Sequence, residues 1–196
     1  PVAPAAPVAA PSADNVPKVT LTDHLRGSAS AQITLVEYSD LECPYCKRFH
    51  PPMQQILKDY SGKVNWVYRH FPLPFHTSAT PAALAAECVN EQAGNTGFWQ
   101  YIDGIFADTN PLTPETITSV AGKLAIDQTQ FKTCLENKKY QKVVDDDLAG
   151  GQKAGINGTP GTVLINNKTG KIQLITGALP IEEIKKAIDA ALLETK

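Results

Sequence analysis

The sequence predicts an α/β fold in which two strand-containing halves flank a long helical block. In the first half, two apolar segments rich in β-branched and aromatic residues enclose a helical segment. Two further strand segments and a helix follow near the end of the chain, and no good strand candidate appears between residues 78 and 155. The expected order is therefore βαβ, an all-helical insertion, and ββα.

The composition is that of an ordinary globular protein. Of the 196 residues, 42% are hydrophobic and 19% are charged, and the formal net charge is -2. This balance supports a sizeable core in one domain, or in one domain that carries an insertion. Because no broad basic excess exists, we expect no nucleic-acid partner, and no apolar run approaches the roughly 18 residues of a membrane span.

Residues 1–20 form a Pro/Ala-rich segment. Five prolines lie among its first 17 residues, which excludes a regular helix or a central strand and indicates an extended spacer. Two interpretations stay open: a tether between a membrane and the folded domain, or a terminus without a role. The chain begins with Pro1, so we expect a processed or trimmed form, and whether a signal peptide or an anchor preceded it is left open.

The first half covers residues 21–77. Residues 33–38 and 64–69 are mostly apolar and β-rich, as buried strands are. Between them, apolar side chains recur at helical spacing over residues 47–60. Pro51 and Pro52 lie within this helix, and we expect them to bend or interrupt it.

The insertion covers residues 78–155 and the second half residues 156–196. Helices are expected at 79–93, 97–107, 114–125, 128–136 and 138–153. Thr113 with Pro114, and then Asp127, supply helix starts within the insertion. In the second half, a hairpin turn joins strands at 162–165 and 172–175, and a helix with one apolar face covers 180–193.

Cys43-Pro44-Tyr45-Cys46 lies where a strand ends and a helix begins. Unpaired backbone N–H groups and the positive end of the helix dipole stabilise a thiolate there, which lowers the pKa of Cys43. The thiolate is the reactive form in disulfide exchange, and two intervening residues let Cys46 close a ring with Cys43. Pro44 suits and stiffens the first helical turn. The motif therefore predicts a redox-active pair.

Other interpretations of this motif are weaker. With His50, the two cysteines supply three zinc ligands, but no second CxxC or paired histidine supplies a fourth, so we expect no metal. Covalent haem attachment needs a histidine at position 47, where lysine stands, and we expect no cofactor. A purely structural disulfide closing so short a loop removes little entropy from the unfolded chain.

Gly158-Thr159-Pro160-Gly161 precedes a predicted strand. A Thr–Pro bond that enters a strand is a candidate for the rare cis form, which is usually kept for a tight turn. An ordinary trans turn is the alternative, and the local sequence alone favours it.

Together these features resemble the DsbA-like thiol oxidases. The resemblance rests on the segment from Leu35 to Cys46, the helical block and Gly158-Thr159-Pro160, and it covers about residues 20 to 196. It implies a thioredoxin-like fold with an all-helical domain inserted between its βαβ and ββα halves. It also implies a low pKa for the first cysteine and an oxidising potential.

The resemblance assigns roles to individual residues. Cys43 matches the exposed nucleophile and Cys46 its buried partner. Pro160 matches a cis-proline that faces the disulfide, and Thr159 a residue that contacts substrate and tunes the potential. Glu37 matches an acidic group beneath the site that helps to move protons, although a carboxylate in an apolar strand fits an exposed edge equally well.

Tyr45 differs from the histidine of the best-known family member. Because the dipeptide between the cysteines tunes thiolate stability, the potential is expected to be less oxidising here. Cys88 and Cys134 both lie on predicted helices. We favour a structural disulfide between them, because the compartment should be oxidising, and two buried thiols or a second redox centre are the alternatives.

These expectations describe an extracytoplasmic protein thiol–disulfide oxidoreductase. We expect a monomer that passes the Cys43–Cys46 disulfide to reduced, partly unfolded client proteins in the periplasm or cell envelope. A membrane thiol oxidase would then reoxidise it. The alternatives are a disulfide reductase or isomerase with the same site, and a non-enzymatic binding module with a structural disulfide.

Overall fold

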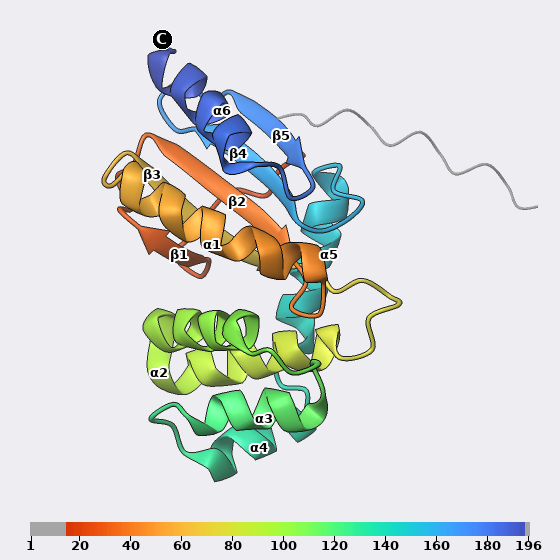
Figure 1. Cartoon of the computed structure of the whole chain (residues 1–196). Coiled ribbons are helices and arrows are strands. Elements are labelled where there is room, and N and C mark those ends of the chain that lie inside the picture. The colour runs from red at the N-terminus through yellow and green to blue at the C-terminus, as the bar shows by residue number, and fades with distance from the viewer. Residues whose placement is uncertain (1–14, 195–196) are drawn as a thin grey trace, which may run out of the picture.

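The computed structural model describes residues 15–194 (Figure 1). Five strands form one sheet in the order β1-β3-β2-β4-β5. β2 (Ile33–Ser39) and β3 (Val64–His70) are parallel, whereas β1 (His24–Gly27), β4 (Gly161–Asn166) and β5 (Ile172–Thr176) pair antiparallel with their neighbours. α1 (Pro44–Asp59) connects β2 to β3, and α6 (Ile181–Leu193) follows β5. The predicted α/β fold with a helical insertion is confirmed.

The sheet separates two apolar clusters. Ile33 and Leu35 of β2 face the cluster that includes α1 and α6, whereas Val36 and Tyr38 face the opposite cluster. This alternation has the period of two expected for a strand buried on both sides. α5 (Gln141–Lys153), predicted as the last helix of the insertion, covers the second face of β2 and β3 (Figure 1).

The remaining helices lie beyond the β1 edge of the sheet (Figure 1). They are α2 (Ala79–Ala107), α3 (Pro114–Gly122) and α4 (Gln128–Glu136). α2 contains both helices predicted at 79–93 and 97–107, joined at Gly94, whose φ of 61° takes it out of the helical region. The predicted starts are present, since the side chains of Thr113 and Asp127 accept hydrogen bonds from backbone N–H groups of the first turn. Among residues 15–194, no helix is both long and apolar enough to span a membrane.

Three features differ from the sequence predictions. β1 was not predicted, because its His-Leu-Arg-Gly sequence is short and polar. Pro51 and Pro52 do not interrupt α1, whose buried side chains, including Met53 and Ile56, hold the helix against the sheet. Ordered structure also begins before Leu21: Val16 is buried in the second cluster, whereas residues 1–14 of the predicted spacer lie outside the described residues.

α5 approaches the sheet through a glycine. A Cβ added at Gly151 would lie 2.7 Å from both Tyr38 Cδ1 and Phe71 Cδ2, which belong to the cluster beneath the helix. Real Cβ atoms do not come so close to a neighbour, so the spacing between α5 and the sheet depends on the missing side chain.

We predict that Gly151→Ala destabilises the fold by about 1–3 kcal/mol, the usual cost of overpacking, although alanine favours a helix by about 1 kcal/mol. Gly122→Ala at the end of α3 is the matched control, because a Cβ there meets nothing within 4 Å. The control should be neutral or stabilising. Urea unfolding of both variants tests this, and a Gly151→Ala protein as stable as wild type would contradict it.

Candidate redox site

Cys43 occupies the N-cap position of α1, with extended backbone angles (φ -73°, ψ 121°). Pro44 is the first helical residue, where the lack of an N–H costs nothing. The backbone N–H groups of Tyr45 and Cys46 are therefore free to interact with the Cys43 sulfur, as the sequence predicted for a helix start.

The pKa of the Cys43 thiol is lowered to about 5. A hydrogen bond from the Cys46 thiol contributes most to this change. Burial opposes it, and Thr159 and the two backbone N–H groups of the first helical turn add to it. Cys43 is consequently a thiolate at neutral pH in the reduced protein.

Cys46 has the opposite electrostatic environment. The residue is fully buried, and burial raises the pKa of its thiol well above the ordinary value. Donation of its hydrogen bond to Cys43 and the charge of Glu37 raise the pKa further. The backbone N–H of Asp40 lies 3.5 Å from the Cys46 sulfur. The reduced pair thus holds one proton, on Cys46, at neutral pH.

The Thr159–Pro160 loop lies against this pair. The peptide bond is cis, and the Cys43 sulfur lies 3.5 Å from the Thr159 carbonyl oxygen. Cys43 is only 3% exposed, so it is less accessible than the exposed nucleophile that the resemblance implied, because this loop covers the sulfur. Tyr45, like Pro44, is exposed, at 56%, and the Arg48 guanidinium lies 5.0 Å from its ring centroid.

Glu37 is completely buried in β2, opposite Tyr68 of β3 and Thr162 of β4. An exposed sheet edge, the alternative interpretation of its sequence, is therefore wrong. Burial raises the pKa of Glu37 to about 7, with Ser39 and Trp66 opposing the rise. Neither carboxylate oxygen has a hydrogen-bond partner of ordinary geometry among the described residues.

Other buried polar atoms on the same face of the sheet also lack a hydrogen-bond partner among the described residues. The side chains of Ser39, Trp66, Tyr68 and Thr162 each have a buried polar atom without a partner in the described part of the chain. Buried polar groups are normally hydrogen-bonded, so a cluster of unsatisfied ones is typical of a functional site or of bound water. Glu37 thus lies in a polar region directly beneath Cys46.

Asp40 organises the loop around the pair, a role that sequence reasoning missed. Its carboxylate accepts hydrogen bonds from the backbone N–H groups of Glu42 (2.7 Å) and Leu73 (2.8 Å) and from Nδ1 of His76 (2.8 Å). Its carbonyl accepts from the N–H of Cys43. An aspartate just after a strand is a common turn former, which is the signal that could have identified it.

His50, the third ligand of the alternative zinc interpretation, has a different partner. Its Nε2 lies 2.7 Å from Oδ1 of Asp103 in α2. The remaining cysteines, Cys88 of α2 and Cys134 of α4, are joined by a disulfide.

Comparison with known proteins agrees with this geometry. A family model described as Thioredoxin matches residues 19–190. This chain belongs to the thioredoxin family. The crystal structure of Pseudomonas aeruginosa DsbA2 is similar to it, with 31% sequence identity, a TM-score of 0.75, and coverage of 90% of this chain and 100% of that one. The protein is therefore a DsbA-like thiol–disulfide oxidoreductase, as the resemblance implied.

A second structure shares the fold of this oxidoreductase. Wolbachia pipientis α-DsbA1 has 24% identity and a TM-score of 0.75, with coverage of 90% of this chain and 92% of that one. The curated relatives have another name: Na⁺/H⁺ antiporter NhaA 1 of Salinispora arenicola is 31% identical over 175 residues, and NhaA 3 of Salinispora tropica is 35% identical over 147. The oxidoreductase spans only 25% and 22% of their respective lengths, so the named antiport activity belongs to those longer proteins.

We predict that Glu37→Gln stabilises the oxidised protein at alkaline pH. Because the folded pKa of Glu37 is raised, the contribution of Glu37 to the free energy of unfolding is fully present below about pH 4.5. It is lost as pH rises through about 7. The difference in the free energy of unfolding between Glu37→Gln and wild type should be near zero at pH 4 and reach at most about 3 kcal/mol at pH 8.5.

Urea unfolding of the oxidised form across this range makes the measurement without interference from the Cys43 thiolate. Glu182→Gln, on the exposed side of α6, is the control and should follow the wild-type curve. A constant difference between Glu37→Gln and wild type at all pH values would show that Glu37 is not the titrating group.

Proposed function

We propose that the protein is an oxidase that donates the Cys43–Cys46 disulfide to reduced, partly unfolded proteins outside the cytoplasm. The observation that carries this proposal is the separation of the two thiol pKa values, about 5 for Cys43 and well above the ordinary value for Cys46. A stabilised Cys43 thiolate favours the reduced protein, so its disulfide is readily given up.

The proposed reaction has two exchange steps. A client thiolate attacks the Cys43 sulfur, the Cys43–Cys46 bond breaks, and its electron pair leaves on Cys46. Glu37, with a pKa of about 7, supplies the proton that Cys46 takes up. A second client thiolate then attacks the client sulfur of the mixed disulfide. The client disulfide forms and Cys43 leaves as a thiolate, so the client has lost the two electrons that the enzyme has gained.

The other site residues support these steps in our proposal. Pro44 and Tyr45 shape the helix start and tune the Cys43 thiolate, while Thr159 and Pro160 bind the client segment beside the sulfur. The carbonyl of Thr159, 3.5 Å from the Cys43 sulfur, supports this placement.

We propose an oxidising compartment, the periplasm or cell envelope, as the place of action. The disulfide between Cys88 and Cys134 supports it, because structural disulfides persist where thiols are not kept reduced. A membrane thiol oxidase would regenerate the Cys43–Cys46 disulfide, and the protein would act as a monomer.

Cys46→Ala should accumulate mixed disulfides with scrambled, disulfide-containing ribonuclease through Cys43, because the Cys43 thiolate attacks a client disulfide and no Cys46 thiol remains to release the client. Non-reducing electrophoresis with peptide mapping identifies the linked cysteine. Cys43→Ala, which leaves only Cys46 with its raised pKa, should give few adducts, and the oxidised wild type should form disulfides in reduced ribonuclease. Adducts found mainly through Cys46 would reverse the assignment.

The direction of exchange is tested by comparing the unfolding free energies of the two redox forms. Because the folded pKa of Cys43 is depressed, the reduced form gains stability that is complete above the unfolded pKa of ~8.5 and is lost as pH falls through about 5. At pH 7 we expect the reduced form to be more stable by about 1–2 kcal/mol after solvent screening.

Urea unfolding at pH 4 and pH 7 measures this difference, with the Cys88–Cys134 disulfide kept intact and verified by mass. An advantage of the reduced form at pH 7 that shrinks at pH 4 supports the oxidase. A more stable oxidised form at pH 7 would instead favour the reductase.

A further inference from the structure

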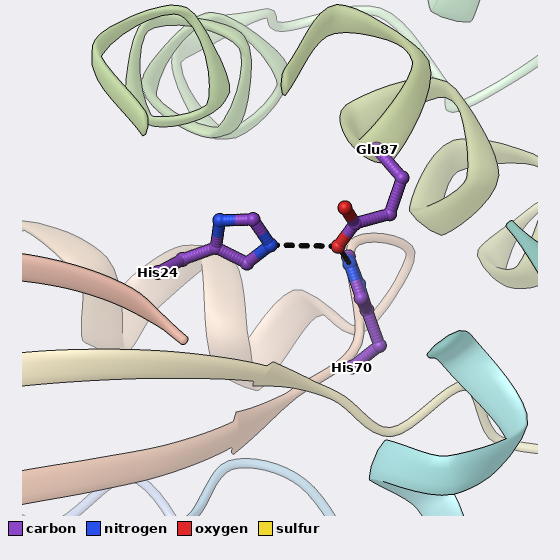
Figure 2. Close-up of side chains that lie close together, drawn as sticks. All are labelled: His24, His70 and Glu87. Carbon is purple, nitrogen blue, oxygen red and sulfur yellow. Dashed lines mark hydrogen bonds and ion pairs between the residues drawn. The ribbon is translucent and has the colours of Figure 1, made fainter. Parts of the chain in front are cut away.

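We propose that His24, His70 and Glu87 form a binding site for a divalent transition-metal cation such as Zn²⁺, apart from the redox pair. Figure 2 shows the two imidazoles converging from different directions on one carboxylate. Nε2 of His24 lies 2.7 Å, and Nε2 of His70 3.0 Å, from Oε1 of Glu87. The three ligand atoms lie within 4.8 Å of one another. Two imidazoles and one carboxylate form a donor set that zinc commonly takes.

The charge of this cluster favours a cation. The side chains of His24, Glu87 and His70 are only 7%, 3% and 1% exposed. Oε1 of Glu87 faces both imidazoles, and no Lys or Arg of the described residues forms an ion pair with this carboxylate. A buried carboxylate is costly without a compensating positive charge. A divalent cation would supply that charge.

Aromatic packing fixes the two imidazoles in converging orientations. The His24 ring stacks on Phe98 with centroids 3.4 Å apart and an interplanar angle of 6°. The His70 ring packs edge-on against Phe98 at 5.8 Å and against Tyr68 at 5.4 Å. Ligands held in this way lose little conformational entropy when they bind a metal.

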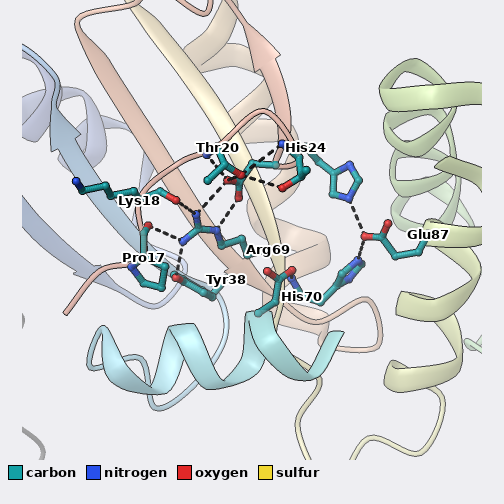
Figure 3. Close-up of polar contacts among 11 residues, drawn as sticks. Pro17, Lys18, Thr20, His24, Tyr38, Arg69, His70 and Glu87 are labelled. Atoms are coloured by element: carbon teal, nitrogen blue, oxygen red, sulfur yellow. Dashed lines mark hydrogen bonds and ion pairs between the residues drawn. The ribbon is translucent and has the colours of Figure 1, made fainter. Parts of the chain in front are cut away.

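A cavity of about 500 Å³ gives access to the cluster, since His24 and Glu87 both line it. Asp147 also lines it, and its carboxylate accepts a hydrogen bond from the backbone N–H of His70 at 2.9 Å. Arg69, which lines the same cavity, is paired with Asp23 at 2.8 Å and donates to Tyr38 and to the carbonyls of Pro17 and Lys18 (Figure 3). The charge of Arg69 is thus balanced. Water from the cavity can serve as the fourth ligand of a cation held by the three protein ligands.

The test uses the full chain with the Cys43–Cys46 disulfide formed, so that neither sulfur of the redox pair binds metal. After chelator treatment, titration calorimetry with Zn²⁺ should show one equivalent bound, and the melting temperature should rise with Zn²⁺ concentration. Glu87→Gln and His24→Gln should each weaken binding by more than about 100-fold, since even second-shell losses cost 10–100-fold.

His50→Gln is the matched control, because His50 is a buried histidine bonded to one carboxylate, Asp103, without a second imidazole. It should bind Zn²⁺ like wild type. Co²⁺ bound to the wild-type protein should show the visible absorption of a tetrahedral site without a thiolate charge-transfer band, a measurement that needs no variant to fold. Failure of the oxidised wild type to bind Zn²⁺, or full retention of binding by Glu87→Gln, would overturn the proposal.

Discussion

The start of helix α1 places two sulfurs, three residues apart, in opposite electrostatic environments. Cys43 lies at the N-cap, where backbone N–H groups and the Cys46 thiol stabilise its negative charge. Cys46 has entered the helix and is buried against the sheet above Glu37, where charge is disfavoured. The rest of the site depends on this difference. Asp40 holds the preceding loop in place, and Thr159 closes the site from the β4 side.

Because side chains alternate along each strand, the two faces of the sheet carry different polar groups. Glu37 of β2 and Tyr68 and His70 of β3 share the face covered by α1 and α2, so the redox site and the proposed metal site lie on one side. Arg69 and Tyr38 point to the other face, where the guanidinium ties the segment before β1 to the sheet. Arg69 of the second face is paired with Asp23, whereas Glu37, Ser39, Trp66 and Tyr68 of the first face have buried polar atoms without a partner among the described residues.

The sequence was sufficient to predict features that depend on residues close together in the chain. The β2–α1–β3 unit, the caps at Thr113 and Asp127, and the strand-to-helix position of Cys43 all follow from local periodicity and composition. The His24–His70–Glu87 cluster was out of reach, because it depends on how β1 pairs with β3 and on which face α2 turns to the sheet. The burial of Cys43 was missed for a similar reason: a loop more than 100 residues away in sequence covers the sulfur.

One turn of α2 contacts both the sheet and α4. Glu87 contacts His24 of β1 and His70 of β3, and the next residue, Cys88, is linked to Cys134 of α4. Consecutive helix positions point about 100° apart, so one turn can bind a partner on each side. Because His70 is also the last residue of the strand that pairs with β2, a cation at the cluster would connect the insertion to the strand pair beneath Cys46.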